Sequence, residues 1–327
     1  MPPSPAPISV LRGFLPGPAD VLAAAARIAP HAHVTPVLRM ASIDRQAGCQ
    51  LHFKAEHLQR AGAFKFRGAC NAVFSLDDTH AARGVVTHSS GNHGAALALA
   101  ARTRGIPCHV VVPEGAVASK LAAIDAYGAT LHRCAPTIAA REAEAARVQA
   151  QTGAELVHPY ADARVISGQG TATLELLTAV PALDVVVVPV GGGGLASGTA
   201  IAAAALSPGT RVVGAEPSGA ADTIASLARG ERITEFTPDT LCDGLRGTLG
   251  APNFELLRSH GVEVLAVDDA DTIAAMRLLW QRGKQLVEPS SAIALAAVLA
   301  QPARFAGLRV GLILSGGNVD LDALPWR

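Results

Sequence analysis

Charged residues are scarce in this sequence, and neither sign is in excess. They make up 17% of the 327 residues, and 27 Lys or Arg balance 27 Asp or Glu. Proteins that bind nucleic acid or anionic membranes usually concentrate basic residues on one face. The composition therefore argues against both kinds of partner. Half of the residues are hydrophobic, which is enough for one large domain or two closely packed ones.

Cysteine and long apolar runs are also limited. The five cysteines form no CxxC pair, which predicts free thiols in a reducing compartment. Glycine, proline or charged residues interrupt every apolar run before it could cross a bilayer. The first 17 residues lack the basic and apolar regions of a signal peptide. We therefore expect a soluble cytoplasmic protein.

Strand patterns alternate with helix patterns along most of the chain. Residues 185–190 are entirely apolar, which predicts a buried parallel strand. The other expected strands are 51–56, 84–87, 109–112, 130–134, 155–157, 211–215, 262–267 and 309–314. The expected helices are 18–30, 66–75, 93–104, 119–127, 138–151, 172–180, 196–206, 222–229, 270–282 and 290–300. This order predicts an α/β protein with parallel sheets covered on both faces, and a change of domain near 78–84 and near 160.

One lysine lies in an apolar, glycine-bounded stretch. Lys65 stands between Phe64 and Phe66 in the segment Gly62–Ala69. Desolvation would lower its pKa from the reference value of about 10.4 and make the amine nucleophilic, as a Schiff-base lysine requires. A lysine that lays its stem on apolar residues and keeps its charge in water is the alternative.

A tetraglycine follows the apolar strand and begins a helix. The backbone N–H groups of Gly191–Leu195 and the helix dipole together favour a bound phosphate. The same loop fits the dinucleotide fingerprint, with Ala196 at its last position and Glu216 about 20 residues further on. Glycines that only allow close helix–strand packing are a third possibility.

Other polar clusters also follow strands. Ser89–Gly94 would form a carboxylate cradle at a helix start or an ordinary N-cap, and His93 alone would be structural. Ser315 would either donate to a ring nitrogen or stabilise a turn. Glu216 and Asp222 could surround a hard cation, although Asp222 also suits a helix N-cap.

With these motifs the chain resembles the serine racemase and serine/threonine dehydratase group of fold-type II pyridoxal-phosphate enzymes. The resemblance runs from about Thr35 to Val319. It depends on the segments Phe64–Ala69, Thr87–Gly94, Gly168–Thr171, Val188–Gly194 and Leu314–Asp320. It implies a fold like that of the tryptophan synthase β subunit. Residues 1–78 and 162–327 would form the large cofactor-binding domain, and residues 79–161 a smaller substrate-side domain.

The resemblance also implies roles for individual residues. Lys65 would hold pyridoxal 5′-phosphate and remove the substrate Cα proton, while Ser90 would act on the opposite face. The implied cofactor-binding residues are Phe64, Lys65, Asn92, Gly191, Gly192, Gly193, Gly194, Leu195 and Ser315. The implied substrate-binding residues are Ser89, Ser90, Asn92, His93 and Arg141. Glu216, the carbonyl of Ala220 and Asp222 would hold Mg²⁺ or Ca²⁺, and a homodimer is expected.

The implied reaction is β-elimination from L-serine, L-threonine or a related 3-hydroxy amino acid, together with serine racemisation. There are two near alternatives. One is an enzyme that is mainly an amino-acid racemase, and the other is a 3-hydroxyaspartate dehydratase. Ser90 matches the racemases, whereas Tyr160 is more similar to the dehydratases. A nicotinamide-dependent oxidoreductase that uses the Gly191 loop is the distant alternative, and a catalytically silent binding protein is another.

Overall fold

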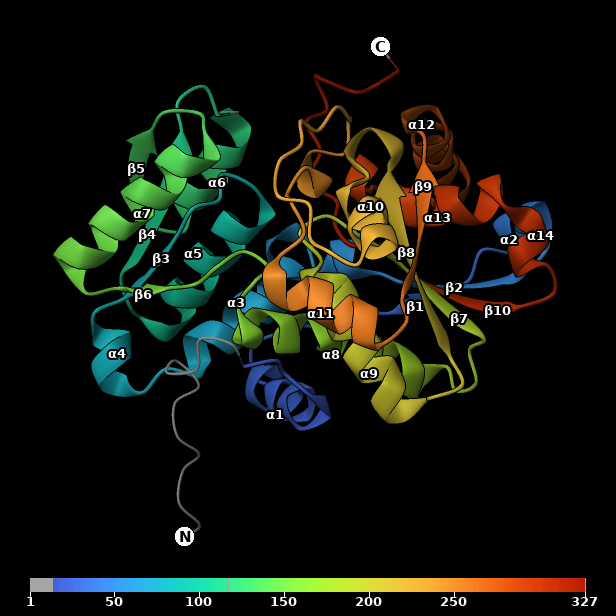
Figure 1. The fold of residues 1–327 in the computed structure, drawn as a ribbon, viewed down its shortest axis with the longest axis horizontal. Coiled ribbons are helices and arrows are strands. Elements are labelled where there is room, and N and C mark those ends of the chain that lie inside the picture. The colour runs from blue at the N-terminus through green and yellow to red at the C-terminus, as the bar shows by residue number, and fades with distance from the viewer. Residues whose placement is uncertain (1–13, 117, 327) are drawn as a thin grey trace, which may run out of the picture.

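The computed structural model describes residues 14–116 and 118–326, which build two sheets side by side (Figure 1). The larger sheet has six strands in the order β1-β2-β10-β7-β8-β9. Its first pair is antiparallel and the rest are parallel. In that order the strands are Val37–Leu38, Gln50–Lys54, Arg309–Ile313, Val185–Pro189, Arg211–Pro217 and Glu263–Val267.

The smaller sheet is wholly parallel and has the order β5-β4-β3-β6. In that order its strands are Thr130–Cys134, Cys108–Pro113, Val85–Thr87 and Glu155–Leu156. These strands all come from the stretch between residues 85 and 156, whereas the larger sheet uses segments before residue 55 and after residue 184. The domain boundaries at residues 78 and 162 stay a prediction.

Helices cover both faces of each sheet, as the alternation of strands and helices predicted (Figure 1). In β7, Val185 and Val187 pack on the side of α13, while Val186 and Val188 pack on the side of α9. The helices are α1 Pro18–Ile28, α2 Ala41–Ala47, α3 Lys65–Phe74, α4 Asp78–Ala82, α5 Asn92–Arg104, α6 Ala118–Ala126, α7 Ile138–Thr152, α8 Ala163–Ala179, α9 Gly194–Leu206, α10 Asp222–Arg229, α11 Ala251–Ser259, α12 Asp269–Leu278, α13 Pro289–Ala300 and α14 Pro302–Phe305.

The main error of the sequence prediction concerns α8. The helix was expected from residue 172, but it begins at Ala163 and includes the motif Gly168–Thr171. A Cβ on Gly168 would lie 2.6 Å from the carbonyl oxygen of Arg67, and one on Gly170 would lie 2.7 Å from that of Gly198. The glycines therefore allow α3 and α9 to approach α8 closely. This packing outweighs the helix-propensity cost of about 1 kcal/mol for each glycine.

Four helices, α2, α4, α11 and α14, were not predicted. Each is short, at 7, 5, 9 and 4 residues, and therefore gives a weak periodic signal. The expected helix 270–282 ends as α12 at Leu278 and continues as a π-helical turn over Leu279–Gly283. The expected strand 51–56 ends at Lys54, so that Glu56 begins a short 3₁₀ turn.

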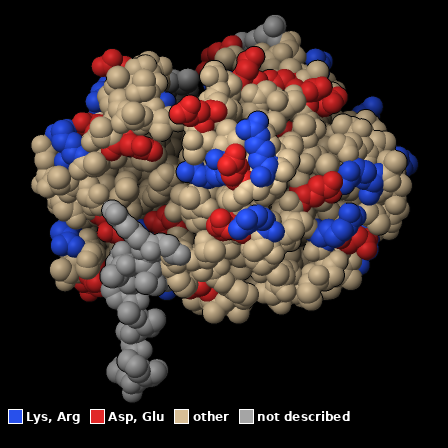
Figure 2. Space-filling model, in the orientation of Figure 1, with Lys and Arg blue, Asp and Glu red and all other residues tan. Residues whose placement is uncertain are grey.

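The surface carries mixed charge, and the cysteines are unpaired. On the face shown in Figure 2, basic and acidic side chains of the described residues are interspersed, with no broad area of one sign. All five cysteines are free thiols, as predicted. Within residues 14–116 and 118–326, no helix is both long and apolar enough to cross a membrane.

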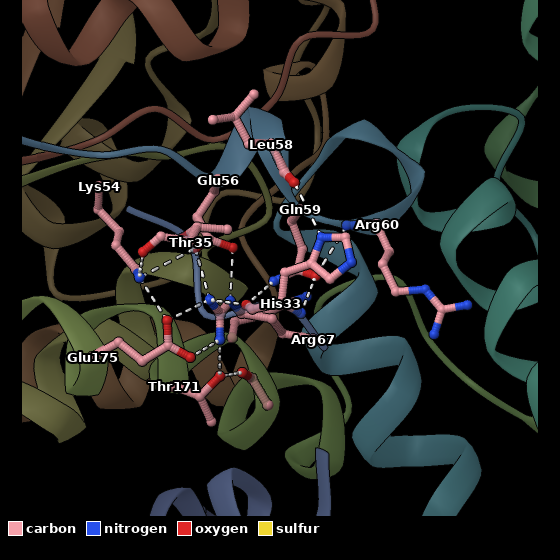
Figure 3. Close-up of polar contacts among 12 residues, drawn as sticks. His33, Thr35, Lys54, Glu56, Leu58, Gln59, Arg60, Arg67, Thr171 and Glu175 are labelled. Atoms are coloured by element: carbon pink, nitrogen blue, oxygen red, sulfur yellow. Dashed lines mark hydrogen bonds and ion pairs between the residues drawn. The ribbon is translucent and has the colours of Figure 1, made fainter. Parts of the chain in front are cut away.

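A buried ion cluster fixes the start of α3. The Arg67 guanidinium donates to both oxygens of Glu56, at 2.7 and 2.8 Å, and to both oxygens of Glu175, at 2.7 and 2.8 Å (Figure 3). Lys54 donates to Glu175 at 2.5 Å and to the carbonyl of Thr35 at 2.7 Å. Arg67 and Glu56 are fully buried. Two cations and two carboxylates give the cluster no net charge, which makes its burial tolerable.

We expect Arg67→Met to lower the free energy of unfolding by about 3–5 kcal/mol, because it leaves buried carboxylates without their main partner. Urea denaturation measures the loss. Arg147→Met is the matched control, since the Arg147–Glu144 pair lies on the surface of α7. Its removal should cost about 0.5 kcal/mol or less. A loss below about 1 kcal/mol in Arg67→Met would show that this cluster does not secure α3.

Candidate active site

A cleft of about 600 Å³ opens between the two sheets. Its wall combines the first residues of α3, α5 and α9 with segments that follow β7 and β10. All of the predicted cofactor and substrate residues line this one cleft: Phe64, Lys65, Ser89, Ser90, Asn92, His93, Arg141, Gly191, Gly192, Gly193, Gly194, Leu195 and Ser315. The fold thus brings together segments more than 200 residues apart in the sequence.

Lys65 is the first residue of α3 and points its amine into the cleft wall. Its Nζ donates to the carbonyl of Pro159 at 2.9 Å and lies 5.1 Å from the centre of the Phe64 ring. Burial lowers the pKa of Lys65 to about 8, against a smaller opposing effect of the nearby Glu288. The neutral fraction of this amine near pH 7 is therefore much larger than that of an ordinary lysine, although the charged form still predominates. This is the property that covalent catalysis by an amine needs.

The tetraglycine loop after β7 presents backbone donors to the cleft. Within the described part of the chain, the N–H groups of Gly191, Gly192 and Gly193 have no acceptor. Gly193 has φ +87°, a conformation that other residues adopt only with strain, and α9 begins at the next residue. Free N–H groups at the start of a 13-residue helix form a site for an anion such as phosphate.

The start of α5 provides a second set of donors. Gly91 is its N-cap and makes no side-chain cap, so the first N–H groups of the helix face the cleft beside Ser89 and Ser90. The His93 ring is buried, and its Nε2 lies 3.3 Å from the carbonyl of Val157. The pKa of His93 is held well below its ordinary value by burial and by Lys65, so the ring is neutral. A carboxylate here would meet the backbone N–H of His93 more readily than its ring.

Glu288 is a cleft residue that sequence reasoning missed. It is only 4% exposed, and its Oε1 accepts from Nδ2 of Asn92 at 2.8 Å. Oδ1 of Asn92 in turn accepts from Nδ2 of Asn318 at 2.9 Å. These contacts fix which way the Asn92 amide faces. The local sequence shows only a glutamate before Pro289 at a helix start, which is an ordinary pattern.

Two further predicted residues have distinct surroundings in the cleft. Ser315, just after β10, donates to the carbonyl of Ser290 over a long 3.4 Å, so its hydroxyl is only weakly engaged. Nε of Arg141 on α7 is buried and has no hydrogen-bond partner among the described residues. An unpartnered guanidinium N–H is costly unless a ligand meets it.

The predicted cation ligands lie apart from the cleft lining. The oxygens of Glu216 accept the N–H groups of Thr223 and Ile224, both at 3.0 Å. One oxygen of Asp222 accepts from the N–H of Leu249 at 2.8 Å, and the other is buried without a partner. Burial raises the pKa of Glu216 to about 7 and that of Asp222 to about 6. Because Glu216 lies outside the lining of the cleft that contains the Gly191 loop, it would not meet a ribose bound there, and this weighs against the dinucleotide interpretation.

Comparison with known proteins agrees with this geometry. Residues 28–316 match the family model of the pyridoxal-phosphate dependent enzymes. The β-hydroxyaspartate dehydratase of Paracoccus denitrificans is 47% identical over 96% of this chain and 100% of its own length. The serine racemase of Dictyostelium discoideum is 47% identical over 93% of this chain and 95% of its own. The maize serine racemase structure superposes with a TM-score of 0.91 at 46% identity, over 94% of this chain and 95% of that one.

The lowered pKa of Lys65 predicts how the apoprotein takes up pyridoxal phosphate. Only the neutral amine attacks an aldehyde, so the rate of attachment should rise with pH around a midpoint of about 8. Borohydride trapping at short times, followed by mass spectrometry, measures that rate. Lys284→Met, which removes an exposed lysine, should leave the profile unchanged. A midpoint near 10.4, the ordinary lysine value, would contradict the effect of burial.

Proposed function

This chain belongs to the pyridoxal-phosphate dependent enzymes, in the group of serine racemases and hydroxy-amino-acid dehydratases, and we propose that its main reaction is the dehydration of a 3-hydroxy amino acid to a 2-keto acid and ammonia. One observation carries the proposal. A partly buried lysine with a lowered pKa shares one cleft with two helix starts that offer free N–H groups. One helix start suits a phosphate and the other suits a carboxylate.

Each group of cleft residues would have its own role in binding or in proton transfer. The Gly191–Leu195 loop would hold the cofactor phosphate, while Asn92 and Ser315 would contact its ring. When bound, pyridoxal phosphate supplies an electron sink for the bonds at the substrate Cα. The N–H groups at the start of α5, with Ser89, would hold the substrate carboxylate. Lys65 would accept the Cα proton at its amine, which requires the neutral form that burial favours.

We propose that the preferred substrate carries a second carboxylate, as 3-hydroxyaspartate does. The unpartnered Nε of Arg141 supports this choice, because a guanidinium pairs well with a carboxylate. Near-complete coverage of a relative named β-hydroxyaspartate dehydratase also supports it. Serine and threonine would be poorer substrates, since they have no second carboxylate to meet the Nε of Arg141.

A panel of L-serine, D-serine, L-threonine and the 3-hydroxyaspartate isomers, assayed for 2-keto acid, tests the function. We expect the highest kcat/KM for a 3-hydroxyaspartate isomer. Arg141→Met should lower that value by about 10–150-fold, the equivalent of one charged hydrogen bond, and should affect serine much less. Arg133→Met, an exposed arginine on the neighbouring strand β5, is the control.

This panel tests the dehydratase function and the preference for a second carboxylate independently. Keto acid from serine or threonine alone would reject the second carboxylate. Absence of keto acid from every substrate would reject the dehydratase function itself.

Serine racemisation is the second activity that we propose. It requires a proton donor on the Cα face opposite Lys65, and Ser90 would be that donor. Ser90→Ala should abolish interconversion of L- and D-serine while leaving most of the L-serine elimination, which needs Lys65 alone. Chiral chromatography beside a pyruvate assay measures the two rates. Equal loss of both reactions would mean that Ser90 only binds the substrate.

We also propose a Mg²⁺ or Ca²⁺ site formed by Glu216, Asp222 and the carbonyl of Ala220. Two buried carboxylates, one of them with an unpartnered oxygen, suit a hard cation. Among the described residues no three His, Cys, Asp or Glu side chains gather to hold a metal. The site would therefore depend on a backbone carbonyl and on water for its remaining ligands.

Removal of the cation should destabilise the native state, because the ion binds the folded chain and not the unfolded one. We expect the melting temperature to rise with added Mg²⁺ or Ca²⁺ and to fall with chelator. Asp222→Asn should remove that dependence, whereas Asp320→Asn near the C-terminus should keep it. If neither cation nor chelator changes the melting temperature, Glu216 and Asp222 have a purely structural role.

The expected homodimer and cytoplasmic location remain proposals. The exposed large apolar side chains include Val34, at 81%, and Leu58 and Leu286, at 49% each. Contacts of His33 with Leu58 and of His57 with Gln285 show that the segments carrying them are adjacent. A second copy of the chain would cover such a surface. Sedimentation of the wild type and of Leu58→Glu would detect the loss of a dimer.

A further inference from the structure

Asn253 lies behind the tetraglycine loop, on the side away from the cleft. It is in the first turn of α11 and is fully buried. Its Nδ2 donates to the carbonyl of Gly192 and, at 3.0 Å, to the carbonyl of Tyr160. Its Oδ1 lies 3.2 Å from the hydroxyl of Ser197, which donates to it. One amide thus joins the loop, the first turn of α9 and the segment that leads out of the smaller sheet.

These contacts determine which way the loop presents its N–H groups. The carbonyl of Gly192 accepts from Asn253 and also from the N–H of Gly250 at 3.1 Å. In a trans peptide the carbonyl of one residue and the N–H of the next point in opposite directions. Because the Gly192 carbonyl faces α11, the N–H of Gly193 must face away from α11. Gly193 lines the cleft, so this N–H is directed at the ligand side.

Close packing prevents the backbone of Gly192 and Gly193 from shifting as a whole. A Cβ on Gly193 would lie 2.8 Å from Cβ of Asn253, and a Cβ on Gly192 would lie 2.3 Å from the Tyr160 ring. The loop is therefore packed between Asn253 and Tyr160. Rotation of the peptide plane is the motion that remains, and the Asn253 amide opposes it.

We propose that Asn253 is a positioning residue that orients the Gly192–Gly193 peptide for a phosphate group. This inference depends on the proposed placement of the cofactor phosphate at this loop. Asn253 touches neither cofactor nor substrate, and its effect passes through the loop backbone. A neutral amide suits the task because it gives two N–H donors to two carbonyls and still accepts from a hydroxyl.

Asp is the sharpest substitution because it keeps the shape of Asn and removes both donors. A carboxylate would face the carbonyls of Gly192 and Tyr160, and their repulsion would favour a rotated peptide plane. The affinity of the apoprotein for pyridoxal phosphate should then fall. The affinity for pyridoxal, which has the same aldehyde but no phosphate, should change little.

The experiment measures dissociation constants of both compounds by absorbance titration of the apoprotein. We expect Asn253→Asp to reduce the preference for pyridoxal phosphate over pyridoxal by about tenfold or more. Asn253→Ala should give a smaller reduction, because the N–H of Gly250 still holds the Gly192 carbonyl. Circular dichroism shows whether the Asp variant folds. If it does not fold, the phosphate preference of Asn253→Ala tests the positioning role instead.

Asn71→Ala is the matched control. Asn71 is also a buried amide with two side-chain contacts, one to Arg27 and one to Arg164, but it lies outside the cleft lining. It should leave the preference for phosphate unchanged. Equal loss of affinity for both compounds in the Asn253 variants, or no loss for either, would overturn the positioning role. Failure of the wild type to bind pyridoxal phosphate would reject the cofactor placement and this inference with it.

Discussion

The pairing of Arg67 with Glu56 and Glu175 is the interaction on which the cleft depends. Taking ions out of water costs several kcal/mol each, and the cost is recovered only when each donor meets an acceptor in good geometry. Arg67 meets both carboxylates with paired hydrogen bonds (Figure 3). It lies two residues beyond Lys65 on α3. Any rotation or slip of α3 that moved Lys65 would therefore break this cluster, so the ion pairs set the position of the lysine.

The low content of charged residues in the sequence, 17%, agrees with the way the cleft is built. The two proposed anion sites consist mainly of backbone N–H groups at the starts of α5 and α9, which need glycine and serine rather than lysine. Lys65 could therefore remain partly neutral, because a phosphate held in this way would not depend on its charge. Arg141 supplies a positive charge to the cleft from α7, the helix that packs on the smaller sheet. Substrate and cofactor would thus be held from both sheets at once.

Local patterns in the sequence predicted the elements that carry local chemistry. The apolar strand at Val185–Val190, the glycine loop after it and the serine loop before α5 were all evident from residue type and spacing. Gly168 and Gly170 were misjudged because their role is contact between three helices, which spacing along one segment does not reveal. Glu288 and Asn253 were missed for the same reason, since their partners lie between 56 and 196 residues away in the sequence. Contacts between residues so far apart in the sequence become evident only in the folded structure.

The site of cofactor attachment tests the account most directly. The chain has four lysines, Lys54, Lys65, Lys120 and Lys284, so peptide mapping can distinguish them. The holoenzyme would be reduced with borohydride, digested and examined by mass spectrometry. We predict one pyridoxyl-phosphate adduct per chain, on the peptide that contains Lys65, together with loss of the visible absorbance band. An adduct on any other lysine, or none at all, would contradict the account.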